Sequence, residues 1–252
     1  MTDEKMTEKR LAELANRAYD GDYYTYTPFL GLAEIHILET AKRTCRELSG
    51  IKVYLYGGAD GCERVIAAFG DEEAFGYPPE FPISCIKIEP LMQKFADNLT
   101  HRDFLGSIMN LGLEREVIGD IVVKENIGYV FCLAGMAAYI IDNITRIKHT
   151  SVTCTVSDYV PEVMADASLI NIQVSSVRID ACVAKVYKIS RGDAGSLIKG
   201  RRVYVNGVLC ENGSYTLKTD DVVSVRGRGR FEFRGIEKSN RKGNLTLSIL
   251  KL

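Results

Sequence analysis

Residues 178–207 constrain the fold of this chain more than any other stretch, because they combine two helix patterns with a strand and a tight turn. A first helix is predicted over residues 178–187, where four apolar residues recur at the spacing of an amphipathic helix: Ile179, Cys182, Val183 and Val186. Ser190 and Asp193 have the spacing of a capping box, which predicts the start of a second helix that ends at Gly200.

A strand and a hairpin turn complete this module. Arg201 and Arg202 lead into the strand, which begins at Val203. Asn206-Gly207 is a dipeptide typical of two-residue hairpin turns, because both residue types adopt positive φ readily. The pattern therefore predicts a small unit of two short helices and a β-hairpin.

The basic residues of this module lie at the predicted helix ends. The N-terminus of the second helix offers free backbone N–H groups and the positive end of the helix dipole, next to Ser190 and Arg191. If the two helices pack antiparallel, four further cations converge with them on one side at phosphate spacing: Arg178, Lys199, Arg201 and Arg202. Arginine would then supply bidentate phosphate contacts and could also stack on bases.

Three more arginines follow the module and alternate with glycines. On an extended strand, Arg226, Arg228 and Arg230 face one side, and the apolar residues around them, such as Val225 and Phe231, face the other. This arrangement suits a track for phosphates, which Arg234 would extend. The competing interpretation is an edge strand charged against aggregation, which does not explain why all the charges have one sign.

The basic character of this region contrasts with the rest of the chain. Residues 176–252 hold 16 Lys and Arg against 7 Asp and Glu, a charge of +9, whereas the remainder holds 16 against 26, a charge of −10. A basic domain on an acidic body is typical of a protein that binds a polyanion such as RNA. A solvated basic face without a ligand is the alternative.

The order of the patterns predicts an α+β chain of three small domains. We expect an N-terminal helical and β domain over residues 1–78, a middle domain over residues 79–165 and the basic module in a domain over residues 176–252. Residues 158–174 are expected to form the linker to the last domain, because their apolar patterning is weaker.

The N-terminal domain is predicted to hold two helices and two strands. The helices are expected over residues 4–19 and from Thr27-Pro28, a helix-start signal, to about Leu48. The strands are expected over residues 52–56 and 64–69, which are rich in β-branched and aromatic residues.

The middle domain is predicted to follow the order strand, helix, strand, strand, helix, strand, beginning at residues 83–88. This is the ferredoxin-like plan, which is also the topology of RRM domains. Thr100 and Asp103 form a capping box at its first helix. The aromatic RNP motifs of an RRM are missing, although Tyr129 and Phe131 lie two apart on one strand face. RNA contact by this domain therefore stays open.

No stretch carries a recognisable catalytic or metal-binding motif. His101-Arg102-Asp103 matches the start of a kinase catalytic loop, but Ile108 stands where that loop needs Asn. Residues 57–61 are rich in glycine and fit neither of the common phosphate-binding loops. The three histidines lie far apart in sequence. We therefore expect no catalytic residue, no metal ion and no cofactor.

Composition favours a cytoplasmic protein. The first ten residues are charged, and the longest uncharged apolar stretch, residues 126–141, has 16 residues, which is short for a membrane span. The seven cysteines stand singly, and their odd number argues against a closed set of disulfides. We therefore expect no membrane segment and free thiols in a reducing compartment.

The order R-I-D, I-S-R-x-x-A and L-I-K-G-R-R-V-Y-V-N-G makes residues 178–207 resemble the S4-type (alpha-L) RNA-binding domain. In that resemblance the RNA-facing pattern falls on seven residues: Arg178, Asp180, Ser190, Arg191, Ala194, Lys199 and Asn206. Ile179 stands where the family usually has leucine, and Gly192 where it often has a small polar residue. The expected RNA-binding site comprises these nine residues and six more: Arg201, Arg202, Val203, Arg226, Arg228 and Arg230.

The whole chain resembles the YlmH type of S4-domain protein in length and domain order, and residues 99–123 resemble the signature of its middle domain. This resemblance implies a non-catalytic, monomeric protein that binds structured ribosomal RNA or tRNA on the large ribosomal subunit. Relatives of this type have been linked to subunits that retain a stalled peptidyl-tRNA and, less directly, to cell division.

Two other functions stay open. An RNA-modifying enzyme of the pseudouridine synthase or methyltransferase class could use the S4-type domain for targeting, although no motif for either chemistry is present. A protein-interaction adaptor, for example in cell division, could instead dock a partner on the acidic N-terminal body.

Overall fold

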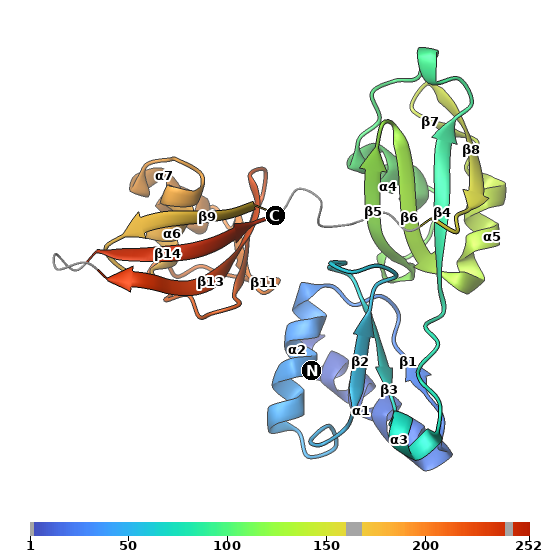
Figure 1. Cartoon of the computed structure of the whole chain (residues 1–252), viewed down its shortest axis with the longest axis horizontal. Coiled ribbons are helices and arrows are strands. Elements are labelled where there is room, and N and C mark those ends of the chain that lie inside the picture. Colours follow the sequence, from blue (N-terminus) through green and yellow to red (C-terminus); the bar gives the residue numbers. More distant parts are fainter. Residues whose placement is uncertain (1–2, 160–167, 240–243) are drawn as a thin grey trace. The chain divides into compact units, whose positions relative to one another are not determined.

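The computed structural model describes residues 3–159, 168–239 and 244–252. The chain divides into two compact units, an N-terminal unit of residues 1–163 and a C-terminal unit of residues 164–252. The N-terminal unit contains two sheets and the C-terminal unit contains one (Figure 1). Within the described ranges, no helix is both long and apolar enough to cross a membrane.

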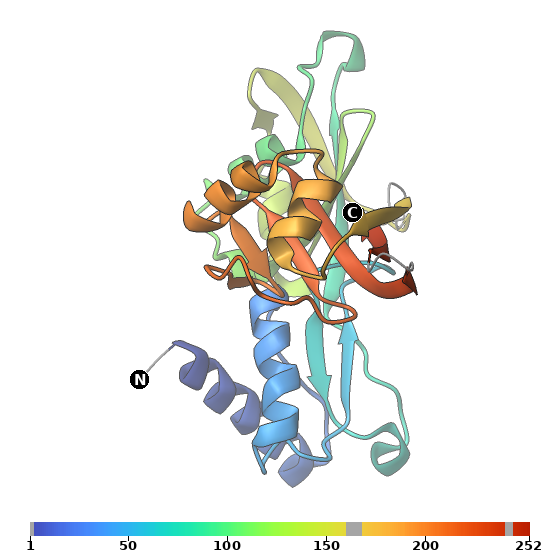
Figure 2. The ribbon, with the colours of Figure 1, turned by 90° about the vertical axis from the view of Figure 1, so that its left-hand side faces the viewer.

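The first sheet of the N-terminal unit is small and carries two helices. α1 (Asp3–Gly21) and α2 (Leu32–Thr44) contact each other and bury apolar side chains such as Leu11 and Leu38 (Figure 1, Figure 2). The antiparallel strands lie in the order β1 (Thr25–Tyr26), β3 (Ile66–Phe69) and β2 (Val53–Tyr56), and the short helix α3 (Glu72–Phe75) follows. The two predicted helices and both predicted strands are present, whereas β1 and α3 were not predicted.

The start of α2 differs from the prediction. The sequence places it at Thr27-Pro28, but the helix begins at Leu32 after the N-cap Gly31. Thr27 joins the sheet instead: its N–H donates to the Ala67 carbonyl at 3.0 Å, and its Oγ1 accepts from the Ala67 N–H at 2.9 Å. The helix-start signal was wrong because a partner 40 positions away in sequence occupies the threonine.

The second sheet of the N-terminal unit has the predicted ferredoxin-like order. Its elements are β4 (Ile83–Pro90), α4 (His101–Met109), β5 (Ile118–Lys124), β6 (Ile127–Leu133), α5 (Ala134–Asn143) and β8 (Thr150–Val156), with the short strand β7 (Arg146–Ile147) and the 3₁₀ turns η1 (Gln93–Phe95) and η2 (Arg115–Val117). The antiparallel strands lie in the order β5-β6-β4-β8-β7. α4 and α5 cover one face through a core that includes Phe104 and Ile140.

The helix-cap interpretation of Thr100 and Asp103 is confirmed. The Thr100 N–H and hydroxyl both donate to Asp103 Oδ2, at 2.8 and 2.6 Å. Lys148 lies 2.8 Å from the same oxygen. Asp103 is therefore committed to the start of α4 rather than to a catalytic loop.

The C-terminal unit is an antiparallel sheet with two helices on one side (Figure 2). Its elements are β9 (Ser168–Val174), α6 (Ile179–Val186), α7 (Arg191–Lys199), β10 (Val203–Val205), β11 (Val208–Leu209), β12 (Val222–Val225), β13 (Gly229–Ser239) and β14 (Leu245–Lys251). The strands lie in the order β11-β10-β12-β13-β14-β9. Both predicted helices are present, and Asn206 and Gly207 make the predicted hairpin turn with φ angles of 49° and 77°.

The strand β9 corrects the expectation of a linker up to residue 174. From Ser168 onward this segment pairs with β14 along its whole length. Ile172 and Val174 face the core, whereas Leu169 is 64% exposed, so the apolar alternation is blurred in the sequence. The sheet of the C-terminal unit therefore begins before the predicted start of the last domain.

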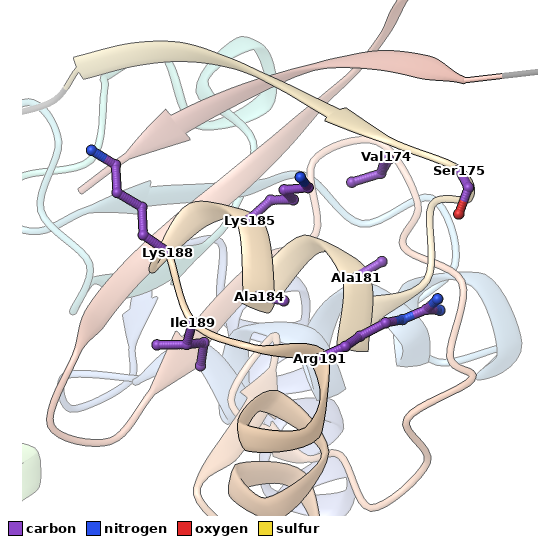
Figure 3. A pocket seen from close by; sticks show the side chains of 8 residues that line it. All are labelled: Val174, Ser175, Ala181, Ala184, Lys185, Lys188, Ile189 and Arg191. Atoms are coloured by element: carbon purple, nitrogen blue, oxygen red, sulfur yellow. The ribbon is translucent and has the colours of Figure 1, made fainter.

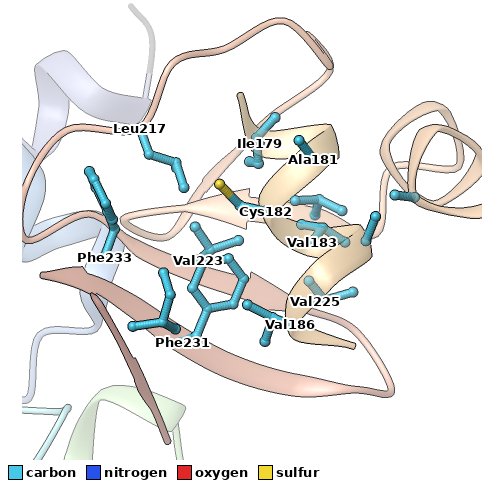
Figure 4. Packing of buried hydrophobic residues seen from close by; sticks show 14 of the residues in the cluster. Ile179, Ala181, Cys182, Val183, Val186, Leu217, Val223, Val225, Phe231 and Phe233 are labelled. Carbon is cyan, nitrogen blue, oxygen red and sulfur yellow. The ribbon is translucent and has the colours of Figure 1, made fainter. Parts of the chain in front are cut away.

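The core of the C-terminal unit lies between its two helices and the sheet. Figure 4 shows Ile179, Cys182 and Val186 of α6 directed at Val223 of β12 and Phe231 of β13. Ala194 and Ile198 of α7 belong to the same buried cluster. This packing fixes the positions of both helix N-termini, where the candidate site begins.

Candidate nucleic-acid interface

Asp180 joins the N-termini of the two helices. Arg178, the N-cap residue of α6, donates from Nε and Nη2 to the two carboxylate oxygens of Asp180 at 3.2 and 2.9 Å. Arg191, the first residue of α7, donates from Nη2 to Asp180 Oδ1 at 3.3 Å. The carboxylate is 15% exposed and the two arginine side chains are 39% and 52% exposed. Asp180 therefore positions two guanidinium groups that remain open to solvent.

The pKa of Asp180 makes this arrangement sensitive to acid. Burial alone would raise that pKa, but the hydrogen bonds from Arg178 and Arg191 outweigh burial and lower it. An aspartate whose native pKa lies below its unfolded value stabilises the fold above that unfolded value, about 3.9. This stabilisation is lost as the pH falls through the native pKa.

We expect Asp180→Asn to lower the free energy of unfolding by about 2 kcal/mol near neutral pH, because it removes the charge that two arginines share. The difference from the wild type should shrink as the pH falls below about 4, because the unfolded chain takes up a proton there and the native carboxylate follows at its lower pKa. Urea unfolding at a series of pH values measures both. An equal deficit at neutral and at acid pH would contradict this role of the charge.

A second group of cations lies at the other end of α7. The helices α6 and α7 cross rather than run antiparallel (Figure 3). Arg191 and Lys199 are the first and last residues of α7, a nine-residue helix about 14 Å long. Beyond Lys199, the Arg202 Nη2 donates to the Arg226 carbonyl at 2.9 Å, and the Arg226 guanidinium lies 4.8 Å from the Tyr204 ring centroid. The predicted cations therefore form two groups, one around Asp180 and one around Tyr204.

The loop of residues 211–216 connects these two groups. The Asp180 N–H donates to the Gly213 carbonyl at 3.4 Å, and Arg201 Nε lies 3.6 Å from a carboxylate oxygen of Glu211. Both contacts are made to one short loop, which therefore borders both groups. Arg201 has a φ of 57° and belongs to the second group. Its guanidinium is paired with the Glu211 carboxylate.

The three arginines after β12 do not form one strand face. Arg226 and Arg228 lie in the turn between β12 and β13, and Gly227 and Gly229 have φ angles of 82° and 105°. Arg230 lies on β13, where burial lowers its pKa. The expected single track is wrong, because the chain reverses at Gly227. Arg226 and Arg228 are exposed at a hairpin tip, whereas Arg230 is half-buried.

Several residues of the predicted site serve the fold. Ile179, Ala194 and Val203 are each fully buried, with 0% of their surface exposed. The Ser190 Oγ accepts from the Asp193 N–H at 3.0 Å and donates to its carboxylate at 2.7 Å, which completes the predicted capping box. By contrast, Gly192 and Lys199 are exposed on α7.

The Asn206 side chain also serves the fold, because it bonds to residues at the start of the neighbouring strand β12. Its Nδ2 donates to Asp221 Oδ1 at 2.9 Å, and its Oδ1 accepts from the Val222 N–H at 2.8 Å. Asp221, which is 5% exposed, also accepts from the Tyr215 hydroxyl at 3.1 Å. Burial, followed by the nearby Asp221 charge, raises the pKa of Tyr215 to about 12.

The middle sheet offers less aromatic surface than its sequence suggests. Phe131 is 1% exposed and packs with Phe29 and Ile66 of the first sheet's domain. A Cβ on Gly58 would lie 2.4 Å from the Phe131 ring, so this contact is tight. Tyr129 is half-buried, and its ring centroid lies 5.4 Å from that of Tyr159. Phe131 is therefore unavailable for stacking on a base in this conformation.

Three residues near the surface were not predicted from the sequence. Tyr204 alternates with two buried valines on β10, and this alternation alone places its ring on the opposite side of the strand. Lys185 and Lys188 lie beside a hollow that exists because β9 packs next to α6. No local pattern marks those two lysines, because the strand that completes the hollow is not recognisable from the sequence.

Family models match the middle and the C-terminal parts of this chain. The model described as "Putative RNA-binding domain in YlmH" matches residues 78–161, and the S4 domain model matches residues 177–223. The S4 match covers α6, α7 and the hairpin, and therefore includes both groups of cations except the arginines beyond β12.

Two individual proteins are similar to this chain. The ribosome-associated protein quality control protein P2 of Bacillus subtilis (strain 168) is 30% identical over 190 residues, which are 74% of this chain and 72% of that protein. A solved structure titled cell division protein ylmH from Streptococcus pneumoniae is 23% identical, with a TM-score of 0.48, and covers 62% of this chain and 93% of its own. The family expected from the sequence is confirmed, and the chain belongs to the YlmH-type S4-domain proteins, with an RNA-binding domain in the middle and an S4 domain near the C-terminus.

Proposed function

We propose that this protein binds structured ribosomal RNA or tRNA on the large ribosomal subunit, as a cytoplasmic monomer that takes part in quality control of stalled subunits. The observation that carries the proposal is the pair of cation groups around Asp180 and Tyr204, which one short loop borders in the C-terminal unit. The name of the Bacillus subtilis relative supports the ribosome as the site of action.

The chemistry of these groups favours binding rather than catalysis. Guanidinium groups stay protonated at neutral pH, so they donate to phosphates and stack on bases but do not abstract protons. The backbone N–H groups at the start of α7 add donors beside Arg191. Double-stranded RNA is recognised largely through its shape and backbone, which such donors can contact without reading base edges.

Affinity for purified ribosomal subunits tests this function. The full chain should bind large subunits more tightly than small subunits, and the logarithm of its affinity should fall linearly with the logarithm of salt concentration, because bound cations release counterions from phosphates. Equal affinity for both subunits would contradict the assignment to the large subunit. A flat salt dependence would contradict RNA binding itself.

The RNA-modifying alternative makes a different prediction. A targeting arm of an enzyme would leave a modified nucleotide that disappears when the gene is deleted. Because we propose a binding function, we expect mass spectrometry of ribosomal RNA and tRNA from the deletion strain to show no lost modification. A lost modification that the purified chain restores would replace the binding function with a catalytic one.

A further inference from the structure

A hollow of about 500 Å³ lies beside α6, next to the end of β9 (Figure 3). Its floor is apolar: Val174, Ala181 and Ala184 are 5%, 7% and 8% exposed, and Ile189 is half-buried. The two alanines stand three residues apart on one face of α6, and their small side chains leave space that a larger residue would fill. The volume lies within the range of ligand pockets in proteins.

Three cations border this hollow: Lys185 on α6, Lys188 in the following turn and Arg191 at the start of α7. All three are exposed. Arg191 pairs with Asp180, whereas neither lysine has an ion-pair partner among the residues that the structure describes. Figure 3 shows Lys188 and Arg191 extending in opposite directions along α6, with Lys185 between them, so the three cations suit successive phosphates of an RNA strand rather than a single anion.

Lys188 occupies a backbone position that favours glycine. The Ile189 N–H donates to the Ala184 carbonyl at 3.0 Å and the Lys188 N–H to the Lys185 carbonyl at 3.4 Å, which is the bonding pattern of a Schellman motif. Lys188 is the left-handed residue of that motif, with a φ of 52°. Glycine is usual there because it has no Cβ, so the lysine is placed beside the hollow at a cost in backbone strain.

We propose that this hollow takes up one unstacked nucleotide of the bound RNA, with the base on the apolar floor and the neighbouring phosphates of the strand against the three cations. The inference rests on the RNA-binding function proposed above. A nucleotide fits because it combines an apolar, flat base with an anionic phosphate, as the floor and the border of the hollow require. Arg191 belongs both to this border and to the group around Asp180, so the hollow opens beside the proposed RNA surface. Proteins commonly read RNA through bases that leave the helical stack.

Two short RNA hairpins test the proposal, identical except that one carries a single bulged nucleotide. The wild-type full chain should bind the bulged hairpin about tenfold more tightly, as measured by fluorescence anisotropy, which corresponds to about 1.4 kcal/mol. Ala184→Leu fills the hollow, and should abolish this preference while leaving the affinity for the paired hairpin unchanged.

Lys188→Gly separates the role in binding from the role in folding. Glycine relieves the left-handed backbone strain, so the melting temperature should not fall, whereas the preference for the bulged hairpin should decrease. Lys238→Ala removes an exposed lysine on β13 and serves as the matched control for charge. This variant should retain the preference for the bulged hairpin.

The outcomes of these experiments distinguish failure of the nucleotide site from failure of the proposed RNA-binding function. Two results overturn the nucleotide site: equal binding of both hairpins by the wild type, or a preference that survives in Ala184→Leu and Lys188→Gly. The proposed RNA-binding function stands in either case if Arg202→Glu with Arg226→Glu still weakens the binding of both hairpins. Failure of the wild type to bind hairpins and large subunits overturns both. Binding of a polyglutamate peptide that Ala184→Leu abolishes, with equal affinity for both hairpins, assigns the hollow to an acidic peptide and also overturns the proposal.

Discussion

Replacing Arg202 and Arg226 together by glutamate is expected to weaken binding to large ribosomal subunits roughly a hundredfold at low salt, or about 2.7 kcal/mol. Both arginines are exposed, and neither has a carboxylate partner among the described residues. Each reversal removes one cation from the phosphates and adds a repelling charge. The slope of log affinity against log salt should therefore become shallower by about two units.

The structural cost of this double replacement should be small. Arg202 loses one hydrogen bond to the Arg226 carbonyl, and Arg226 loses its cation–π contact over the half-buried Tyr204 ring. Exposed contacts of this kind contribute about 1 kcal/mol or less. Thermal unfolding of the variant measures that cost and shows whether weaker RNA binding reflects a loss of fold.

A matched control lies in the N-terminal unit. Arg43 and Arg46 are exposed, and replacing both by glutamate produces the same change in net charge. If the arginines of the S4 domain contact the RNA, this control should retain most of its affinity, because Arg43 and Arg46 do not belong to that domain. An equal loss in both double variants would mean that net charge, rather than the proposed surface, governs binding.

Local signals in the sequence located the ends of the S4-domain helices correctly, because short-range bonds fix them. Ser190 bonds with Asp193, three positions away, and the hairpin at Asn206 and Gly207 needs only the positive φ that both residue types tolerate. Predictions of this kind require no knowledge of the sheet. They also gave the correct order of elements in the middle domain.

Long-range pairing explains why the strand β9 was not predicted. β9 is stabilised by β14, so that Ser168 pairs with Lys251 and Val174 with Leu245. The segment therefore looks weakly patterned when it is read alone. The arginine track failed for a different, local reason: Val225 pairs with Gly229 in a tight hairpin, and Gly227 and Gly229 adopt the positive φ that the reversal needs.

The candidate site could be predicted by residue type but not by arrangement. The sequence indicates cations near helix ends, but it does not show that Asp180 holds Arg178 and Arg191 together. It also cannot distinguish a polar residue that faces RNA from one that holds a turn, as Asn206 does. The RNA-binding role of the individual residues stays a prediction that the double replacement above tests.

The N-terminal unit depends on a different set of charges, at the junction of its two sheets. Arg64 donates from Nε to the Ile118 carbonyl at 2.9 Å and from Nη2 to the Phe29 carbonyl at 2.8 Å. Asp120 accepts from the backbone N–H of Glu63 and of Arg64. Burial lowers the pKa of Arg64 and raises that of Asp120, so each charge depends on its neighbours for compensation.

Arg64→Met is therefore expected to lower the stability of the N-terminal unit by about 3 kcal/mol, because it removes the donor to the Phe29 carbonyl and leaves Arg115 to offset the charge of Asp120 without Arg64. Lys52→Met is the matched control, since it removes a half-exposed cation from the half-buried Asp71 and the exposed Glu73 and should cost about 1 kcal/mol or less. Hydrogen exchange of the β3 and β5 amides in increasing urea measures both changes at the junction. Equal losses in the two variants would show that Arg64 behaves like a surface charge, and that apolar packing around Phe131 alone holds the two sheets together.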